Sequence, residues 1–299
     1  MTQKIRIVEV GPRDGLQNVK VQVPLDLRER LIQNLRMAGL KEIEIGSFVS
    51  EKWVPQMAGT QELCQRFHGN QKGLMALVPN RKGFDSFLES GLEKLAFFTA
   101  ASEEFNLKNT NKSIEDSLRG YQTLACEARD KDLFIRMYVS TVFHCPYSGR
   151  VALKDLDSVF CFLDQLPFDE LSLGDTIGKA TPREVREVTK LALSHFEGSR
   201  ITYHFHDTYG MALSNVSTAM DAGISSFDSS VSGLGGCPYA PGASGNLATE
   251  DLVYLCEAQG MSTGIDLQSL CLVSDEIDRF LNRNSPSRVQ AVFKNQAIS

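Results

Sequence analysis

The sequence lacks any surplus of basic residues and any apolar run long enough to cross a bilayer. Its 299 residues include 31 Lys and Arg against 37 Asp and Glu, a formal net charge of −6 with histidine neutral. General nucleic-acid binders carry a basic face, and a membrane-spanning helix needs about 20 apolar residues, so neither class of protein fits. The 42% hydrophobic and 23% charged residues are typical of a globular protein. We expect neither a nucleic-acid nor a membrane partner.

The seven cysteines lack CxxC spacing, and their number is odd. This usage is typical of a reducing compartment, where a cysteine with a special role is reactive rather than part of a disulfide. Met1 is followed almost directly by a strand-like segment, with no apolar signal core and no Arg- and Ser-rich transit segment. We therefore expect a cytoplasmic location.

Short apolar or alternating runs recur along the whole chain, separated by stretches with the apolar spacing of one-sided helices. Because strand and helix alternate, the pattern indicates parallel βαβ units. The clearest predicted helices cover residues 25–38, 113–131, 182–196 and 213–222. The eight predicted strands cover residues 5–10, 42–46, 74–78, 95–99, 134–140, 170–173, 201–206 and 224–229.

Eight such units in roughly 250 residues match the size of one TIM barrel. The alternative is a doubly wound open sheet, but the first strand-to-helix junction, residues 10–17, lacks the glycine fingerprint of a dinucleotide fold. We therefore predict an α/β protein, a (β/α)8 TIM barrel with additional C-terminal helices. Residues 1–299 are expected to form a single catalytic domain, with residues from about 250 to 299 as a helical extension, strongest at 267–281, and a weakly patterned tail.

Strand alternation turns polar side chains from three strands toward the barrel interior. Interiors of barrels often hold satisfied polar networks, so a structural role is open for any single one of them. Buried charges and hydroxyls on several strands are nevertheless costly unless they are paired or functional. The inward-facing set is Glu42, Glu44, Gly46, Arg136, Tyr138, Ser140 and Ser172, with Asp175 at the end of its strand.

His204 and His206 give the strongest local signal, because two histidines two residues apart on a strand point the same way. Both imidazoles can then reach one cation, although an isolated His-x-His is often accidental. Asp14, after the first strand, and Asn246, after the last, are candidate oxygen ligands. A set of two nitrogens and two oxygens with room for water or substrate suits Mg²⁺ or Mn²⁺ better than structural zinc.

Residues 233–246 contain five glycines in a polar segment after the last predicted strand. Such a segment allows close approach to a ligand, so we interpret it as a lid or ligand-facing loop, with a merely flexible connection as the alternative. Cys237 lies in this loop, where an exposed thiol invites oxidation unless its reactivity is used. The other six cysteines are expected to fill the core.

Taken together, five segments resemble the hydroxymethylglutaryl-CoA lyase family, which belongs to the metal-dependent lyase and synthase barrels. The resemblance extends in order from about residue 5 to 284, and the loop containing Cys237 discriminates best. The wider superfamily shares the Arg13-Asp14 and His-x-His elements. The segments are VGPRDGLQN at 10–18, Glu44 with SFVSEKWVPQM at 47–57, SLGDTIG at 172–178, HFHDTYG at 204–210, and GLGGCPY at 233–239 through GNLATED at 245–251.

The resemblance implies an acyl-CoA substrate, 3-hydroxy-3-methylglutaryl-CoA, cleaved to acetyl-CoA and acetoacetate in leucine degradation and ketone-body formation. It also implies a divalent cation, Mg²⁺ or Mn²⁺, that polarises substrate oxygens. We further expect a homodimer, for which the C-terminal helices could supply the interface. The implied metal ligands are Asp14, His204, His206 and Asn246.

The resemblance also implies roles for other residues. Arg13 stabilises the developing enolate oxygen, and Cys237 delivers a proton to the enolate carbon. The base is either Asp14, if metal ligation leaves one oxygen free, or a water positioned by Glu44. The residues implied in substrate binding are Arg13, Gln17, Tyr138, Ser172 and Thr176.

Two other functions remain open at this point. One is a condensing synthase or aldolase that acts on a 2-oxo acid with the same metal site. The other is a catalytically silent barrel that binds metabolites as a regulator, although the chemical residues are all present.

Two positions depart from the family pattern: His144, where a small residue is common, and Gly46, where threonine is common. Acyl-group preference is also open, because one methylene changes discrimination by only about 1–3 kcal/mol.

Overall fold

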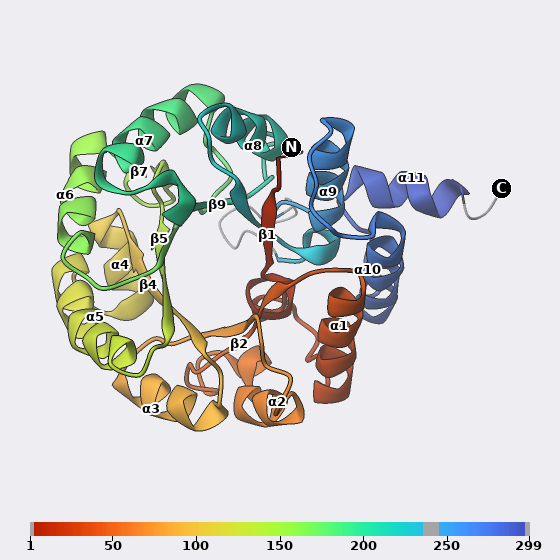
Figure 1. The fold of residues 1–299 in the computed structure, drawn as a ribbon, viewed down its shortest axis with the longest axis horizontal. Helices are drawn as coiled ribbons and strands as arrows, with labels where there is room; N and C mark the ends of the chain where they lie inside the picture. Colours follow the sequence, from red (N-terminus) through yellow and green to blue (C-terminus); the bar gives the residue numbers. More distant parts are fainter. Residues whose placement is uncertain (1–2, 236–244, 297–299) are drawn as a thin grey trace.

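The computed structural model describes residues 3–235 and 245–296. Eight parallel strands close into a barrel in the order β1-β10-β9-β8-β5-β4-β3-β2, so the predicted TIM barrel is confirmed and the open sheet is excluded (Figure 1). A two-stranded hairpin, β6 and β7, lies outside it. The strands are β1 Arg6–Glu9, β2 Glu42–Ser47, β3 Leu74–Leu77, β4 Lys94–Ala100, β5 Phe134–Ser140, β6 His144–Cys145, β7 Gly149–Arg150, β8 Glu170–Asp175, β9 Ile201–Phe205 and β10 Ser226–Ser229.

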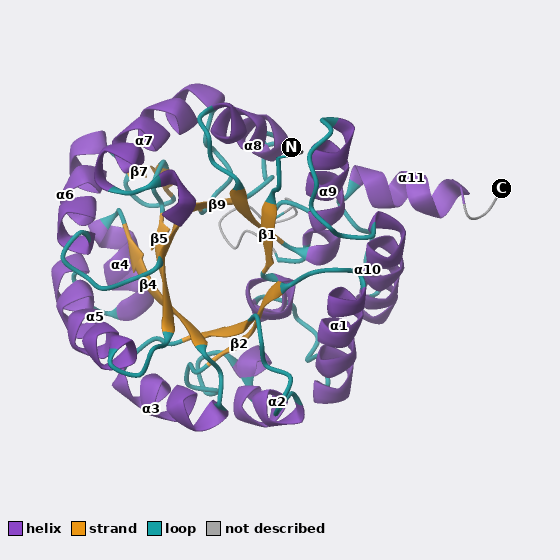
Figure 2. Ribbon diagram, viewed as in Figure 1, coloured by secondary structure: helices purple, strands orange, loops and turns teal. Residues whose placement is uncertain are grey.

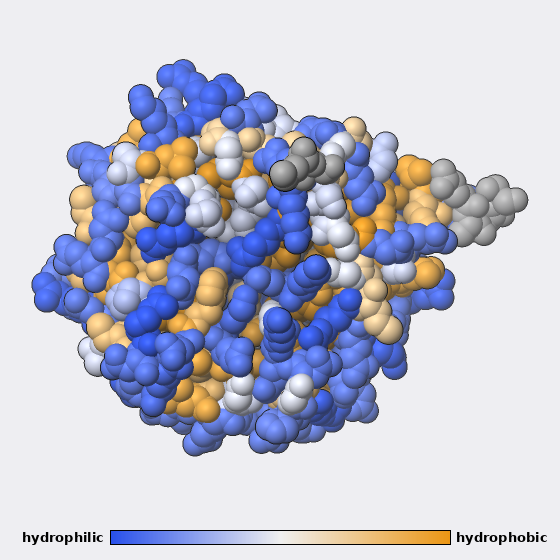
Figure 3. Space-filling view, viewed as in Figure 1, coloured by the Kyte–Doolittle hydropathy of each residue, from blue (hydrophilic) through white to orange (hydrophobic). Residues whose placement is uncertain are grey.

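Helices surround the barrel as an outer ring (Figure 2). Most of the hydrophobic core lies between the outward faces of the strands and the inward faces of these helices. On the face seen in Figure 3, hydrophilic residues cover much of the surface and alternate with smaller hydrophobic areas. The helices are α1 Leu25–Met37, α2 Thr60–Arg66, α3 Arg81–Ser90, α4 Glu103–Thr110, α5 Ile114–Arg129, α6 Leu153–Leu163, α7 Pro182–His195, α8 Ala212–Asp221, α9 Thr249–Ala258, α10 Leu267–Leu281 and α11 Arg288–Gln296.

Local sequence signals explain where several helices begin and end. The Ser113 side chain accepts a hydrogen bond from Asp116 N at the start of α5, and Thr181 forms a capping box with Glu184 at the start of α7. Gly91 ends α3 in the left-handed conformation at φ 77°, which glycine adopts without steric cost. These caps set where the three helices begin or end.

The strand alternation holds, with one exception at the end of β2. Ile43 and Ile45 pack in the core between strands and helices, and Glu44 is fully buried on the other face. The pairing of β2 with β3 shifts register between Glu44 and Gly46. A Cβ atom at Gly46 would lie 2.6 Å from Oγ1 of Thr60 in α2, so the inward orientation predicted for Gly46 is wrong. The bulge turns this residue toward the helix layer.

The C-terminal helices pack on one side of the barrel. The helix α9 follows β10 and packs against α8, and α10 packs against both α1 and α9. The predicted helix at 267–281 is confirmed residue for residue. The tail is more ordered than its weak pattern suggested, because α11 packs against α9 and α10 (Figure 1). In the described part of the chain, no helix is both long and apolar enough to span a membrane.

The interpretation of six cysteines as core residues is wrong for two of them. Cys126 on α5 and Cys161 on α6 are exposed, because both lie on the polar sides of amphipathic helices. The four that are buried are Cys64, Cys145, Cys256 and Cys271. Cys237 lies outside the described residues.

Candidate active site

Arg13 and Asp14 lie at the carboxyl end of β1, in a π-helix at Gly11–Gly15 that begins directly after the strand. The amides of Arg13, Asp14 and Gly15 all donate to the carbonyl oxygen of Val10. This compact turn brings the Arg13 and Asp14 side chains to the barrel mouth, where they contact each other. It places the predicted Arg-Asp pair next to the predicted interior carboxylate of β2.

The Arg13 guanidinium is clamped by two carboxylates. Its Nε and Nη2 atoms each lie 2.6 Å from Oε2 of Glu44, and Nη1 donates to Oδ1 of Asp14 at 2.7 Å. The Tyr138 hydroxyl also donates to Oε2 of Glu44, at 3.1 Å, and its ring lies 5.4 Å from the guanidinium. Burial opposes the charge on Arg13, but Glu44 and Asp14 keep its pKa above the ordinary value. Arg13 is therefore a fixed cation with its orientation set from two sides.

Asp14, His204 and His206 converge at the same end of the barrel, with ligand atoms all within 4.8 Å of one another. Nε2 of His204 is 3.9 Å from Oδ2 of Asp14. Asn246 reaches this cluster from the segment after β10, where its Nδ2 donates to Oδ2 of Asp14 at 2.8 Å and it forms a β-bridge with His206. The structure thus brings together all four residues predicted as metal ligands.

Two buried atoms in this cluster have no hydrogen-bond partner among the described residues: Oδ1 of Asn246 and Nδ1 of His206. An unpartnered buried acceptor costs free energy unless something binds it. Burial and the neighbouring His204 lower the pKa of His206 to about 4, so its imidazole is neutral and can donate a lone pair. Nitrogen and oxygen donors of this kind fit a divalent cation with open positions.

Asp228 on β10 contacts His204 of the cluster, and no role was predicted for this residue from the sequence. Its Oδ2 lies 3.1 Å from Nδ1 of His204 and accepts a hydrogen bond from Ser172 at 2.9 Å, while Oδ1 pairs with Arg136. A carboxylate on one imidazole nitrogen fixes the tautomer and directs the other nitrogen toward the cation. The signal was present, because alternation in Ser226–Ser229 turns Asp228 inward and Phe227 outward.

The remaining predicted substrate-binding residues lie around the same mouth with different environments. Ser172 is buried, and its hydroxyl donates a hydrogen bond to Asp228. Oγ1 of Thr176 accepts a hydrogen bond from the Thr141 amide at 2.7 Å. Gln17 is half-buried just after the π-helix. His144 is on β6, where its Nε2 lies 3.1 Å from Glu184 of α7, so this departure from the family pattern ties the hairpin to the helix ring.

Glu9 is a second buried carboxylate that the sequence reading missed. It ends β1, where Oε1 accepts from the amides of Gly11 and Val231 at 2.8 Å each and Oε2 accepts from Thr249 at 2.7 Å. Burial raises the pKa of Glu9 to about 7. These hydrogen bonds join the end of β1 to Val231 and Thr249, which both follow β10, and so connect the first and last strands of the barrel.

Replacing Glu9 with glutamine should flatten the dependence of stability on pH. The folded pKa lies near 7 against an ordinary 4.5, so the folded state holds a proton that the unfolded chain releases. Stability from this group is therefore complete below about pH 4.5 and falls by about 3 kcal/mol as the pH rises toward 7. Urea unfolding of the native protein, Glu9→Gln and the exposed control Glu115→Gln across this range tests it. Equal pH profiles for all three would rule the assignment out.

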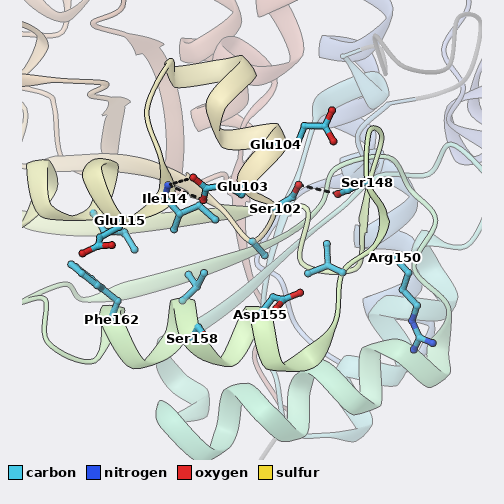
Figure 4. A pocket seen from close by; sticks show the side chains of 14 residues that line it. Ser102, Glu103, Glu104, Ile114, Glu115, Ser148, Arg150, Asp155, Ser158 and Phe162 are labelled. Carbon is cyan, nitrogen blue, oxygen red and sulfur yellow. Dashed lines mark hydrogen bonds between the residues drawn. The ribbon is translucent and has the colours of Figure 1, made fainter.

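A cavity of about 760 Å³ opens between α4, α5, α6 and the β6–β7 hairpin (Figure 4). At its edge Ser102 bonds to Ser148, and Glu103 accepts from the Ile114 amide. The residues predicted for the active site do not line it. The cavity and the Asp-His-His cluster are therefore separate features.

The closed barrel and the cluster at the carboxyl ends of its strands define the class of protein: a (β/α)8 barrel with an Asp-His-His group at its mouth whose ligand atoms lie close enough to hold a metal ion. The HMGL-like family model matches residues 4–277, and the chain belongs to this family. It is 44% identical to hydroxymethylglutaryl-CoA lyase of Pseudomonas mevalonii, over 96% of this chain and 95% of that one. It is 45% identical to the 3-hydroxy-3-isohexenylglutaryl-CoA/hydroxy-methylglutaryl-CoA lyase of Pseudomonas aeruginosa, over 96% of each chain.

Solved structures give the same result. The crystal structure of the HMG-CoA lyase of Bacillus subtilis matches with a TM-score of 0.94 at 42% identity, and the match covers 98% of both chains. Similarity over nearly the full length confirms the resemblance first drawn from five sequence segments, and it confirms the fold independently of the strand pattern.

Proposed function

We propose that this protein is a divalent-metal-dependent carbon-carbon lyase that cleaves 3-hydroxy-3-methylglutaryl-CoA to acetyl-CoA and acetoacetate. The observation that carries the proposal is the convergence of Asp14, His204, His206 and Asn246 beside a buried Arg13. Relatives that are 44% and 45% identical over 96% of this chain bear the name of that enzyme. A condensing synthase on a 2-oxo acid would use similar ligands, so the substrate is the point to test.

Asp14, His204, His206 and Asn246 would hold the cation, which is Mg²⁺ or Mn²⁺ in this proposal. When bound, such a cation supplies Lewis-acid polarisation of substrate oxygens. Asp228 keeps Nδ1 of His204 engaged, which leaves Nε2 for the cation side. Both unpartnered atoms, Oδ1 of Asn246 and Nδ1 of His206, lie in this ligand set.

Asp14 is the base in this proposal, and Glu44 positions Arg13. The Asp14 side chain is 24% exposed, and its Oδ2 is the oxygen that faces His204 and Asn246, which leaves Oδ1 to accept the proton. The Glu44 side chain is 0% exposed and is engaged by Arg13 and Tyr138. Asp14 takes the proton from the tertiary hydroxyl, and the C2–C3 bond breaks. Its electron pair passes into the thioester enolate, and C3 becomes the ketone carbon of acetoacetate.

Arg13 stabilises the enolate oxygen. A guanidinium has five N–H donors, of which Glu44 occupies two and Asp14 one. Two N–H groups remain to donate to the oxygen on which negative charge develops. Because Glu44 and Asp14 already fix the guanidinium plane, little reorganisation is needed as that charge appears.

Cys237 completes the reaction as the proton donor to the enolate carbon, and solvent exchange then restores its thiol and the Asp14 carboxylate. Replacing Cys237 with serine should lower kcat by about 10²–10⁴-fold, the range for a lost general acid, and leave metal affinity unchanged. Cys126→Ser, at an exposed site on α5, is the matched control. Steady-state turnover and metal titration measure the two effects. Full turnover in Cys237→Ser would remove this thiol from the mechanism.

The substrate assignment is tested with purified protein and Mg²⁺. Hydroxymethylglutaryl-CoA should yield acetoacetate, whereas a mixture of a 2-oxo acid and acetyl-CoA should yield no condensation product. The opposite pattern would favour the synthase. A short panel of 3-hydroxy-3-methylacyl-CoA analogues with longer chains then measures acyl preference, since the Pseudomonas aeruginosa relative is named for two substrates of different size.

A cytoplasmic location and a homodimer remain predictions. Named relatives include both cytoplasmic and mitochondrial lyases, so the family does not fix the compartment. Light scattering on the full chain measures the oligomeric state. A mass near twice 33.1 kDa is expected for the dimer.

A further inference from the structure

A second cluster of metal-ligating side chains lies on the outer helix ring. Asp157 and Cys161 on α6 and His195, the last residue of α7, have ligand atoms all within 4.8 Å of one another. Asp164, which follows α6 directly, lies beside the same imidazole. Asp157 and Cys161 are four residues apart, which places them on one face of α6, and Asp164 lies three residues beyond Cys161.

This cluster is far from the active site. The helices of a (β/α)8 barrel run antiparallel to its strands, so helix carboxyl ends lie at the amino ends of the strands. From His195 the chain passes through Gly198–Arg200 straight into the amino end of β9, whereas His204 and His206 are at its carboxyl end. The two clusters therefore cannot share a cation.

His195 is already oriented as a metal ligand would be. Nδ1 lies 2.7 Å from Oδ2 of Asp164, and Nε2 lies 2.9 Å from Oδ1 of Asp157. The ring also packs edge-on against Phe160 at 5.6 Å between centroids. A carboxylate on one ring nitrogen and a ligand position at the other is the usual arrangement of a metal-bound histidine.

We propose that Asp157, Cys161 and His195 bind a thiophilic divalent transition metal such as Zn²⁺, which clasps α6 to α7. Thiolate, imidazole and carboxylate are all zinc ligands, and water can fill the fourth position because Cys161 and Asp157 are solvent-accessible. Tetrahedral zinc needs ligand atoms about 3.5 Å apart, so binding requires small rotations of the exposed Asp157 and Cys161 side chains. Binding releases the Cys161 thiol proton and the second imidazole proton to solvent.

Mg²⁺ would not compete for this site, because it prefers oxygen ligands and octahedral geometry. The catalytic cluster has no described cysteine among its ligands. A thiolate-to-metal signal therefore reports on the helix-ring site, even where the same ion also enters the barrel mouth through its imidazole ligands. The clasp should act on stability and leave the lyase reaction unaffected.

The test uses metal-stripped full-length protein in excess Mg²⁺, titrated with Co²⁺ at mildly alkaline pH. A thiolate-to-cobalt charge-transfer band should appear and saturate. The band should be lost in Cys161→Ser and kept in Cys126→Ser, the other exposed cysteine in the described chain. Asp164→Asn should weaken the affinity by about tenfold or more, as loss of a carboxylate behind a metal-bound histidine does.

Thermal unfolding supplies a second readout. Zn²⁺ should raise the Tm of the native protein and of Cys126→Ser by more than that of Cys161→Ser, because each ion that binds only the folded state stabilises it and this variant lacks one of the two sites. Cys161→Ser should keep its lyase activity. Absence of the cobalt band in the native protein, or its persistence in Cys161→Ser, would overturn the proposal.

Discussion

Replacing Arg13 with glutamine should lower kcat and kcat/KM together by about 10²–10³-fold, the usual effect of losing one donor to a developing oxyanion. Glu44 and Asp14 engage three of the five N–H groups of Arg13, so two remain free to donate to the enolate oxygen. Glutamine has neither this pair of donors nor the positive charge. An equal fall in both constants indicates an interaction made only in the transition state. Steady-state kinetics at saturating Mg²⁺ measures it.

The Arg13→Gln substitution also leaves Glu44 as a buried carboxylate without its main cation, which by itself destabilises the fold. The double variant Arg13→Gln/Glu44→Gln removes that charge and serves as the control. It should recover thermal stability but not turnover. Recovery of turnover in the double variant would mean that Arg13 acts only as a structural partner of Glu44, contrary to the assigned role.

Asp228→Asn should cause the second large effect, on metal affinity and on stability at once. Asp228 is fully buried between Arg136, Ser172 and His204. Loss of its charge leaves Glu170, at 3.3 Å, as the ion-pair partner of Arg136 among the described residues, so we expect a stability loss of about 3–5 kcal/mol. Loss of the carboxylate behind His204 should weaken metal binding by about 10–100-fold.

Ser172→Ala separates these two effects. It removes one hydrogen bond to Asp228 but leaves the bond to the His204 imidazole, so it should cost about 1 kcal/mol of stability without changing metal affinity. Calorimetric metal titration and urea unfolding of both variants make the comparison. If Asp228→Asn bound metal as tightly as the native protein, His204 would not depend on Asp228 for its orientation.

The sequence predicts the barrel well because parallel strands buried on both faces leave short apolar runs, and helix caps mark the segments between them. The helix at 267–281 is correct to the residue. The bulge before Gly46 could not be predicted, since it depends on pairing between β2 and β3 rather than on local pattern. The exposure of Cys126 and Cys161 was missed because a helical context alone does not say which face a residue occupies.

The candidate site follows from topology. Asp14, His204, His206 and Asn246 are far apart in sequence, yet residues that follow parallel strands meet at one mouth of a closed barrel. What the sequence reading missed is the support behind these residues. Asp228 carries a readable signal, since the same alternation that turns Glu44 inward on β2 turns Asp228 inward on β10. Contacts such as those of Glu9 across the barrel closure need the three-dimensional structure.

The most direct test of the account is metal-dependent cleavage of hydroxymethylglutaryl-CoA by the purified full-length chain. Acetyl-CoA and acetoacetate should form in equal amounts with Mg²⁺ or Mn²⁺ present, cease to form after chelation, and form again when the cation is restored. Cleavage that continues unchanged in the chelated protein, or no acetoacetate at all from the metal-loaded protein, would contradict it.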